Sequence, residues 1–277
     1  MKIVHGKIEM IFEPQDQSLA EDLLQFAEST LTELHKRFDL KLPASVKLVI
    51  LTSWPTFPFR TAPWYLQPLV VLTFPFWALR TRRIWPMAGG WQQSYPGGVA
   101  AVGIKPPRLI EAADRSLGEE IFRAIEDPLV KQHSILAHEM THACTDDLRL
   151  PVWLHEGLAM AMSDHVLNVQ TVLPRSRRLI RAQDLTPEKL KMAYRGRDRE
   201  GLLALYAAGY WLVRWLEEAQ PSVLKDLLGQ RMPHLEVESR VASALGCQPE
   251  QIWNCLEAMA ADEFSGFVKL DVGTEQS

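Results

Sequence analysis

Hydrophobic residues recur with two different spacings along the chain, first mainly that of strands and later that of helices. Residues 3–12 alternate apolar and polar side chains and 46–51 form the short apolar run VKLVIL, so both predict strands. Residues 18–38 carry the spacing of an amphipathic helix. After residue 111 helical patterns dominate, over 116–126, 129–146, 152–166, 187–194, 201–219, 222–230, 237–245 and 249–263. This order predicts an α+β fold with the sheet in the N-terminal part.

The chain is long enough for one sizeable core or for two lobes, with 277 residues of which 47% are hydrophobic. We expect an N-terminal α+β lobe over 1–127 and a helical lobe over 128–277. The N-terminal lobe is expected to contain an insertion at 54–96.

The expected insertion at 54–96 has an unusual composition, with five tryptophans and seven prolines. The prolines argue against a long helix. Residues 69–79 are apolar apart from Thr73, and arginines follow directly. We favour a segment that packs on its lobe and covers a cleft, but tryptophan beside arginine also suits a peripheral contact with an anionic membrane. No acidic residue occurs between Asp39 and Glu111, whereas eight basic residues do: Lys41, Lys47, Arg60, Arg80, Arg82, Arg83, Lys105 and Arg108.

The chemistry of the chain is concentrated at residues 138–142, which read H-E-M-T-H. On a helix, His138 and His142 lie one turn apart on the same face and can bind one metal ion. Glu139 projects beside them, where it can act on water. Thirteen residues separate His142 from Glu156, the expected third ligand in the segment WLHEGLA. Zn²⁺ bound by two imidazoles and one carboxylate keeps a position open for chemistry.

Local signals support helices around these residues. Asp127 and Pro128 suit the cap and first turn of the first helix, Pro151 suits the first turn of the second, and residues 146–150 form a short turn between them.

These motifs resemble those of the gluzincin metallopeptidases, the group of thermolysin and aminopeptidase N. The pattern is most similar to the small peptidase MA-like proteins, in which H-E-x-T-H, a short turn and P-x-W-L-x-E-G-L-A follow one another. The specific resemblance covers about 138–216. It implies a zinc metallopeptidase that acts on a peptide or protein substrate, with a gluzincin/thermolysin-like fold and zinc in the cleft between a small mixed sheet lobe and a helical lobe.

The resemblance also implies roles for single residues. Glu139 is the expected general base and then general acid, and a tyrosine of a later helix is expected to stabilise the oxyanion. Tyr206 is the first candidate and Tyr210 the second, since both lie on one helix face. In thermolysin-like enzymes a carboxylate orients one of the zinc histidines, but Met160 stands at that position here. Asp164, Asp146 and Asp147 are the alternatives for this role.

The strand expected at 97–104 bears on substrate choice. In gluzincins the strand before the zinc helix is the sheet edge to which a substrate peptide adds, and glycines here would allow a close approach. Aminopeptidase N-like enzymes carry a glutamate near this point, which residues 97–104 lack. We therefore expect an endopeptidase or processing enzyme.

The cysteines, the N-terminal residues and the charge distribution bear on disulfides, location and partners. Cys144, Cys247 and Cys255 are too few and too widely spaced for a disulfide framework or a cysteine zinc site. Residues 1–7 lack a secretory signal, so a cytoplasmic or membrane-peripheral location is expected. Residues 175–199 hold nine basic side chains and three acidic ones, but no nucleic-acid-binding fold accompanies them, so no nucleic-acid partner is expected. The competing class is a non-catalytic binding protein on a peptidase scaffold.

Overall fold

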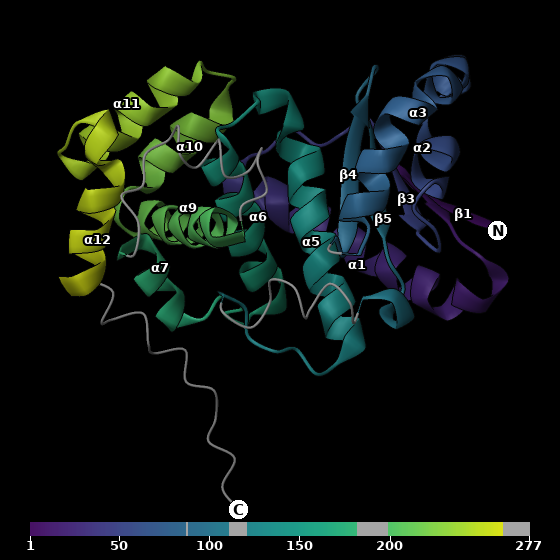
Figure 1. Cartoon of the computed structure of the whole chain (residues 1–277), viewed down its shortest axis with the longest axis horizontal. Coiled ribbons are helices and arrows are strands. Elements are labelled where there is room, and N and C mark those ends of the chain that lie inside the picture. Colours follow the sequence, from purple (N-terminus) through teal and green to yellow (C-terminus); the bar gives the residue numbers. More distant parts are fainter. Residues whose placement is uncertain (87, 111–120, 182–198, 263–277) are drawn as a thin grey trace, which may run out of the picture. The chain divides into compact units, whose positions relative to one another are not determined.

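A computed structural model describes residues 1–86, 88–110, 121–181 and 199–262. It confirms an α+β fold, with one mixed five-stranded sheet and mainly helices elsewhere (Figure 1). Contacts group the chain into two compact units: Met1–Glu119, Ala124–Arg149 and Met162–Asn168 form the first, and Glu120–Arg123, Leu150–Ala161 and Val169–Ser277 form the second.

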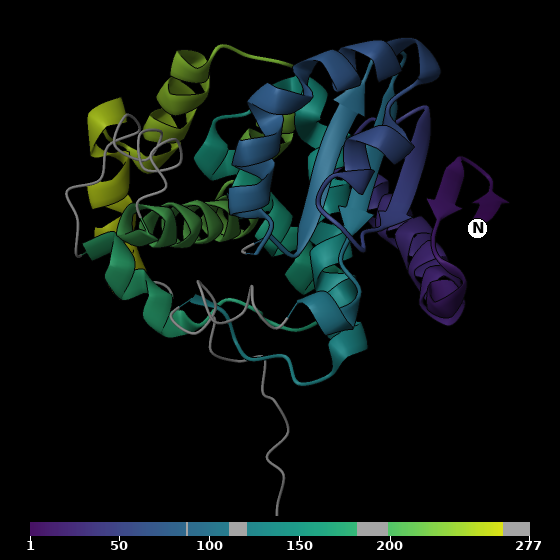
Figure 2. The same cartoon turned by 45° about the vertical axis from the view of Figure 1, so that its right-hand side comes forward.

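The sheet belongs to the first unit and has the strand order β1-β2-β3-β5-β4. The central strands β2, β3 and β5 are parallel, whereas β1 and β4 pair antiparallel at the two edges. A single strand over 3–12 was wrong, because Gly6 (φ 55°) turns the chain into the hairpin seen near the N-terminus in Figure 2. The strands are β1 (Lys2–His5), β2 (Ile8–Ile11), β3 (Ser45–Ile50), β4 (Gly90–Tyr95) and β5 (Val99–Ile104).

The strand register gives the sheet two apolar faces. Met10, Leu48 and Val102 lie side by side and are buried on the face covered by α1 (Gln17–Phe38) and α5 (Pro128–Thr145). The opposite face presents Val49 and Ala101 to Phe57 and Trp85. Because α5 packs on α1, β4 and β5, it is grouped with the sheet, although the sequence placed it in the lobe that begins at residue 128.

The segment 54–96 contains a long helix, so the expectation drawn from its prolines was wrong. Helix α2 (Thr56–Thr61) is followed by the 18-residue helix α3 (Gln67–Ile84). Pro68 lies in the first turn of α3, where a backbone N–H has no helical partner, and only Pro75 interrupts the interior. Aromatic packing offsets this cost, since Trp77 and Phe74 of α3 contact each other and Trp54.

A buried lysine fastens the end of α3 to the sheet. Lys105, at the end of β5, is 1% exposed, donates through Nζ to the carbonyl of Trp85 and lies 4.2 Å from the centroid of that ring. Burial lowers the pKa of Lys105 to about 8. Gln132 of α5 in turn donates to the Lys105 carbonyl at 2.7 Å, so α3, β5 and α5 are joined at one point.

The remaining helices agree well with the sequence pattern. Of the expected helix at 116–126, residues 122–126 are not helical, because Phe122 forms an isolated bridge with Val172; the rest of it before residue 121, and the helix at 187–194, lie outside the described residues. No helix in the described ranges is long and apolar enough to cross a membrane. The helices are α6 (Val152–Leu167), α7 (Arg178–Arg181), α9 (Arg199–Ala219), α10 (Pro221–Gly229), α11 (His234–Leu245) and α12 (Ile252–Asp262).

Candidate metal centre

Helix α5 presents the two histidines. The Asp127 carboxylate accepts hydrogen bonds from the backbone N–H groups of Leu129 (2.8 Å) and Val130 (3.4 Å), which confirms the expected cap, and Pro128 occupies the first turn. Leu136 and Met140 are fully buried on the opposite side of the helix. The packed side of α5 therefore fixes the direction in which the histidines project.

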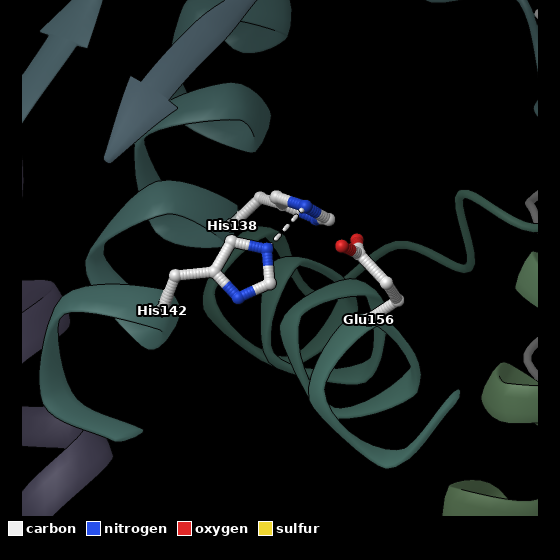
Figure 3. A group of neighbouring side chains, drawn as sticks. All are labelled: His138, His142 and Glu156. Carbon is white, nitrogen blue, oxygen red and sulfur yellow. Dashed lines mark hydrogen bonds between the residues drawn. The ribbon is translucent and has the colours of Figure 1, made fainter. Parts of the chain in front are cut away.

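His138 and His142 lie on consecutive turns and face each other. Their Nε2 atoms are 3.0 Å apart, and the two rings are perpendicular with centroids 4.6 Å apart (Figure 3). His142 is buried and His138 is half-buried. The pair thus points two imidazole nitrogens at one place, as the H-E-x-x-H spacing predicts.

Glu156 of α6 completes a group of three ligands. Arg149 (φ 50°) ends the turn after α5, and the Pro151 carbonyl accepts the first bonds of α6 from the N–H groups of Leu154 and His155, at 3.0 Å each. The Glu156 side chain is 6% exposed. Its carboxylate points toward the histidines in Figure 3, and one ligand atom from each of the three residues lies within 4.8 Å of the others.

The spacing and ligand types of this group could hold one metal ion, and zinc serves as the example. A tetrahedral zinc about 2.1 Å from each ligand would hold the ligand atoms about 3.4 Å apart. The two histidine Nε2 atoms, 3.0 Å apart, lie near that value, and no two of the three ligand atoms are more than 4.8 Å apart. In addition, a cation balances the charge of a buried carboxylate. The three predicted ligands are therefore brought together as a possible metal site.

A hydrogen bond between α5 and α6 supports this spacing. Ser163 Oγ donates to the Ser134 carbonyl at 3.0 Å, and both residues belong to the first unit. Ser163 follows Glu156 by seven residues on the continuous helix α6, which places both on the same stripe of that helix. The bond thus joins α6 to α5 at a point two helical turns beyond Glu156.

Glu139 is half-buried against the start of the edge strand β4. A Cβ atom added to Gly90 would lie 2.6 Å from Glu139 Cγ and 2.9 Å from its Oε1. Only glycine allows the β4 backbone to approach the carboxylate so closely. Gly90 was not predicted from the sequence, although two consecutive glycines, Gly89 and Gly90, before an aromatic residue indicate a close backbone approach.

The prediction that residues 97–104 form the sheet edge was wrong. They form β5 and the preceding turn, and β5 lies between β3 and β4. Gly97 (φ 83°) and Gly98 (φ 74°) turn the β4–β5 hairpin, and Gly103 makes room for the side chains of Leu51 and Phe57. These glycines therefore serve the fold, and the strand next to Glu139 is β4.

Within the second unit, α9 crosses the first part of α6 by backbone contact beside the third ligand. A Cβ on Gly157, the residue after Glu156, would collide with the carbonyl group of Gly209 on α9 and lie 3.0 Å from the Tyr210 nitrogen. A Cβ on Gly209 would likewise collide with the Trp153 carbonyl. The glycine of the E-G-L-A segment thus permits α9 to pack directly on α6. The matching Gly209 was not singled out from sequence, although a glycine inside a helical pattern usually has a packing reason.

The two candidate tyrosines lie on α9 on either side of this crossing. Tyr210 is 1% exposed, and its ring packs edge-on against Trp211 with centroids 4.9 Å apart. Tyr206, about one turn before the crossing, is half-buried. Tyr206 is therefore the more exposed of the two tyrosines.

The other residues considered near the ligands differ in burial. Of the acidic residues weighed as partners for a zinc histidine, Asp164 on α6 is buried, whereas Asp146 and Asp147 are exposed. Burial raises the pKa of the Cys144 thiol to about 12, so this cysteine is inert packing near neutral pH.

Comparison of the chain with models of protein families, with curated proteins and with solved structures found no match.

Proposed function

We propose that this protein is a zinc-dependent metallopeptidase of the gluzincin type. The convergence of His138, His142 and Glu156 on one point is the observation that carries the proposal. Bound there, zinc supplies Lewis acidity that activates water and polarises a carbonyl near neutral pH. Two nitrogen ligands and one oxygen ligand leave the fourth position for reactants.

Glu139 is the acid–base group in this proposal. It follows the first ligand directly and approaches the β4 backbone at Gly90. Its carboxylate takes a proton from the attacking water and passes it to the amine that leaves. Because Glu139 is only half-buried, it remains open to exchange this proton.

The substrate is an extended peptide that adds to the outer edge of β4. Within the described residues β4 pairs only with β5, so its other edge can hydrogen-bond to a peptide backbone. A peptide there would run past Glu139. Residues 90–95 read GWQQSY and include no carboxylate to hold a free amino terminus. This favours an endopeptidase or processing enzyme.

Removal of the metal tests the proposed reaction. We expect cleavage of an unfolded, fluorescently labelled protein substrate that stops after chelation and returns when one equivalent of Zn²⁺ is added. Cleavage is measured as the appearance of new amino groups and as the change in fluorescence when the labelled substrate is cut. Purified protein that binds zinc tightly but cleaves none of a broad set of unfolded substrates would instead support a binding protein.

Tyr206 is the proposed oxyanion donor, which predicts unequal effects of two matched substitutions. Tyr206→Phe removes a donor from the developing oxyanion and should lower kcat about 10²–10³-fold with little change in KM. Tyr210→Phe, at the enclosed position, should change kcat far less. Steady-state kinetics of both variants check this, and the reverse order of effects would transfer the role to Tyr210.

A further inference from the structure

The clearest feature that the proposed reaction does not use is an apolar stripe on the outer side of α3. Leu69, Leu72, Phe76 and Leu79 recur at the spacing of one helix face, and they are 54%, 73%, 85% and 67% exposed. Trp64, just before the helix, is 84% exposed. We call these five residues the α3 stripe.

Exposed hydrophobic side chains are concentrated here. Elsewhere in the described residues they occur mostly as isolated cases such as Val4, Val169 and Leu235. Isolated exposed residues need no explanation, but a contiguous apolar surface marks a place where the protein contacts something else.

The side chains on the inner side of the same helix are already packed against other residues. Phe74 and Trp77 pack against each other, with ring centroids 5.0 Å apart, and against Trp54 and Phe59 of the neighbouring segment, with ring centroids 6.0–6.4 Å apart. Lys105 holds the end of the helix through the Trp85 carbonyl. Helix α3 lies beside α2 (Figure 1), and its aromatic side is already packed there, so the α3 stripe cannot turn inward without breaking these aromatic contacts.

The charges around the α3 stripe favour an anionic partner. The last turns of α3 contain Arg80, Arg82 and Arg83, and the chain has no acidic residue from 40 to 110. The Arg82 side chain is exposed. Arg60 of α2 is the exception, since Glu13 lies 3.8 Å from it and partly neutralises it.

We propose that the α3 stripe lies in the surface of an anionic lipid bilayer, as a peripheral contact. The apolar side chains would enter the boundary of the acyl chains while the exposed Arg82 meets lipid phosphates. Trp64 is of the residue type enriched at that depth. A second copy of this chain fits less well, because a twofold contact would bring together two surfaces that both carry the exposed Arg82. This inference does not depend on the peptidase activity.

Flotation of the full chain with vesicles tests the proposal. Wild type should bind phosphatidylglycerol-containing vesicles and bind neutral phosphatidylcholine vesicles much less, and binding should weaken as salt is raised. The double variant Leu72→Ser/Phe76→Ser should bind at least about tenfold more weakly. The matched control Leu235→Ser removes an equally exposed leucine, 78% exposed on α11, and should bind as wild type does.

A charge reversal gives a second test that leaves the apolar side chains in place. Arg82→Glu should weaken vesicle binding by more than about fivefold. Far-UV circular dichroism establishes that each variant is folded. No binding by wild type, equal binding to neutral vesicles, or unchanged binding of both stripe and charge variants would overturn the proposal. A wild-type dimer that the double variant breaks, without vesicle binding, would assign the stripe to a second copy and also overturn it.

Discussion

Glu139→Gln is expected to retain the metal and to lose about 10²–10⁴-fold in kcat. The substitution keeps the size of the side chain and so its close approach to the β4 backbone, where a Cβ at Gly90 would lie 2.6 Å from Glu139 Cγ. It removes the carboxylate that accepts a proton, and general acid–base catalysis contributes about this factor. The ligands His138, His142 and Glu156 are untouched.

Steady-state cleavage kinetics and zinc analysis on the same samples check this result. Glu250→Gln, at an exposed position outside the site, is the matched control and should behave as wild type. If Glu139→Gln kept its turnover, another group would have to move the proton and the assignment of Glu139 would be wrong. If it lost zinc as well, its role would be in assembling the site.

Gly209→Ala should be among the most destabilising single substitutions in the chain. The added methyl group would collide with the Trp153 carbonyl on α6, and neither helix backbone can move alone. Overpacking costs about 1–3 kcal/mol and occasionally more, and a collision with backbone belongs at the upper end. The intrinsic preference of helices for alanine offsets at most about 1 kcal/mol. We therefore expect a loss of about 2–3 kcal/mol.

Gly229→Ala is the matched control for this change. Gly229 ends α10, and a Cβ there would meet nothing within 4 Å. The free energy of unfolding, measured with urea, should stay within about 0.5 kcal/mol of wild type in this control. Equal stability of the two alanine variants would contradict the close crossing of α6 and α9.

Much of this fold can be predicted from the sequence, because helix caps and hydrophobic periodicity indicate the same elements that are buried in the structure. Helix α1, strand β3 and the two helices around the site follow from periodicity, and Asp127 caps α5 as expected. The ligand group follows from two spacings in the sequence. His138 and His142 are one helical turn apart in α5, and only a short connection separates α5 from Glu156 in α6. These features depend on residues that are close in the chain, where geometry is restricted.

Features that depend on distant residues could not be predicted in this way. Strand order placed β4 at the edge next to Glu139, and no pattern within 97–104 shows that β5 is internal. The helix at 67–84 forms despite Pro75 because aromatic residues of other segments stabilise it. The Gly157–Gly209 contact joins residues of two helices, so each glycine is explained only by the other.

Zinc per chain in protein purified without added metal, measured by mass spectrometry, tests the central claim most directly. About one zinc ion per chain is expected in wild type and clearly less in Glu156→Ala, whose third ligand is missing. His155→Ala, next to the ligand but outside the group of three, should retain the metal. A folded wild type that contains no zinc and takes none up, or a Glu156→Ala variant with full zinc content, would contradict the account.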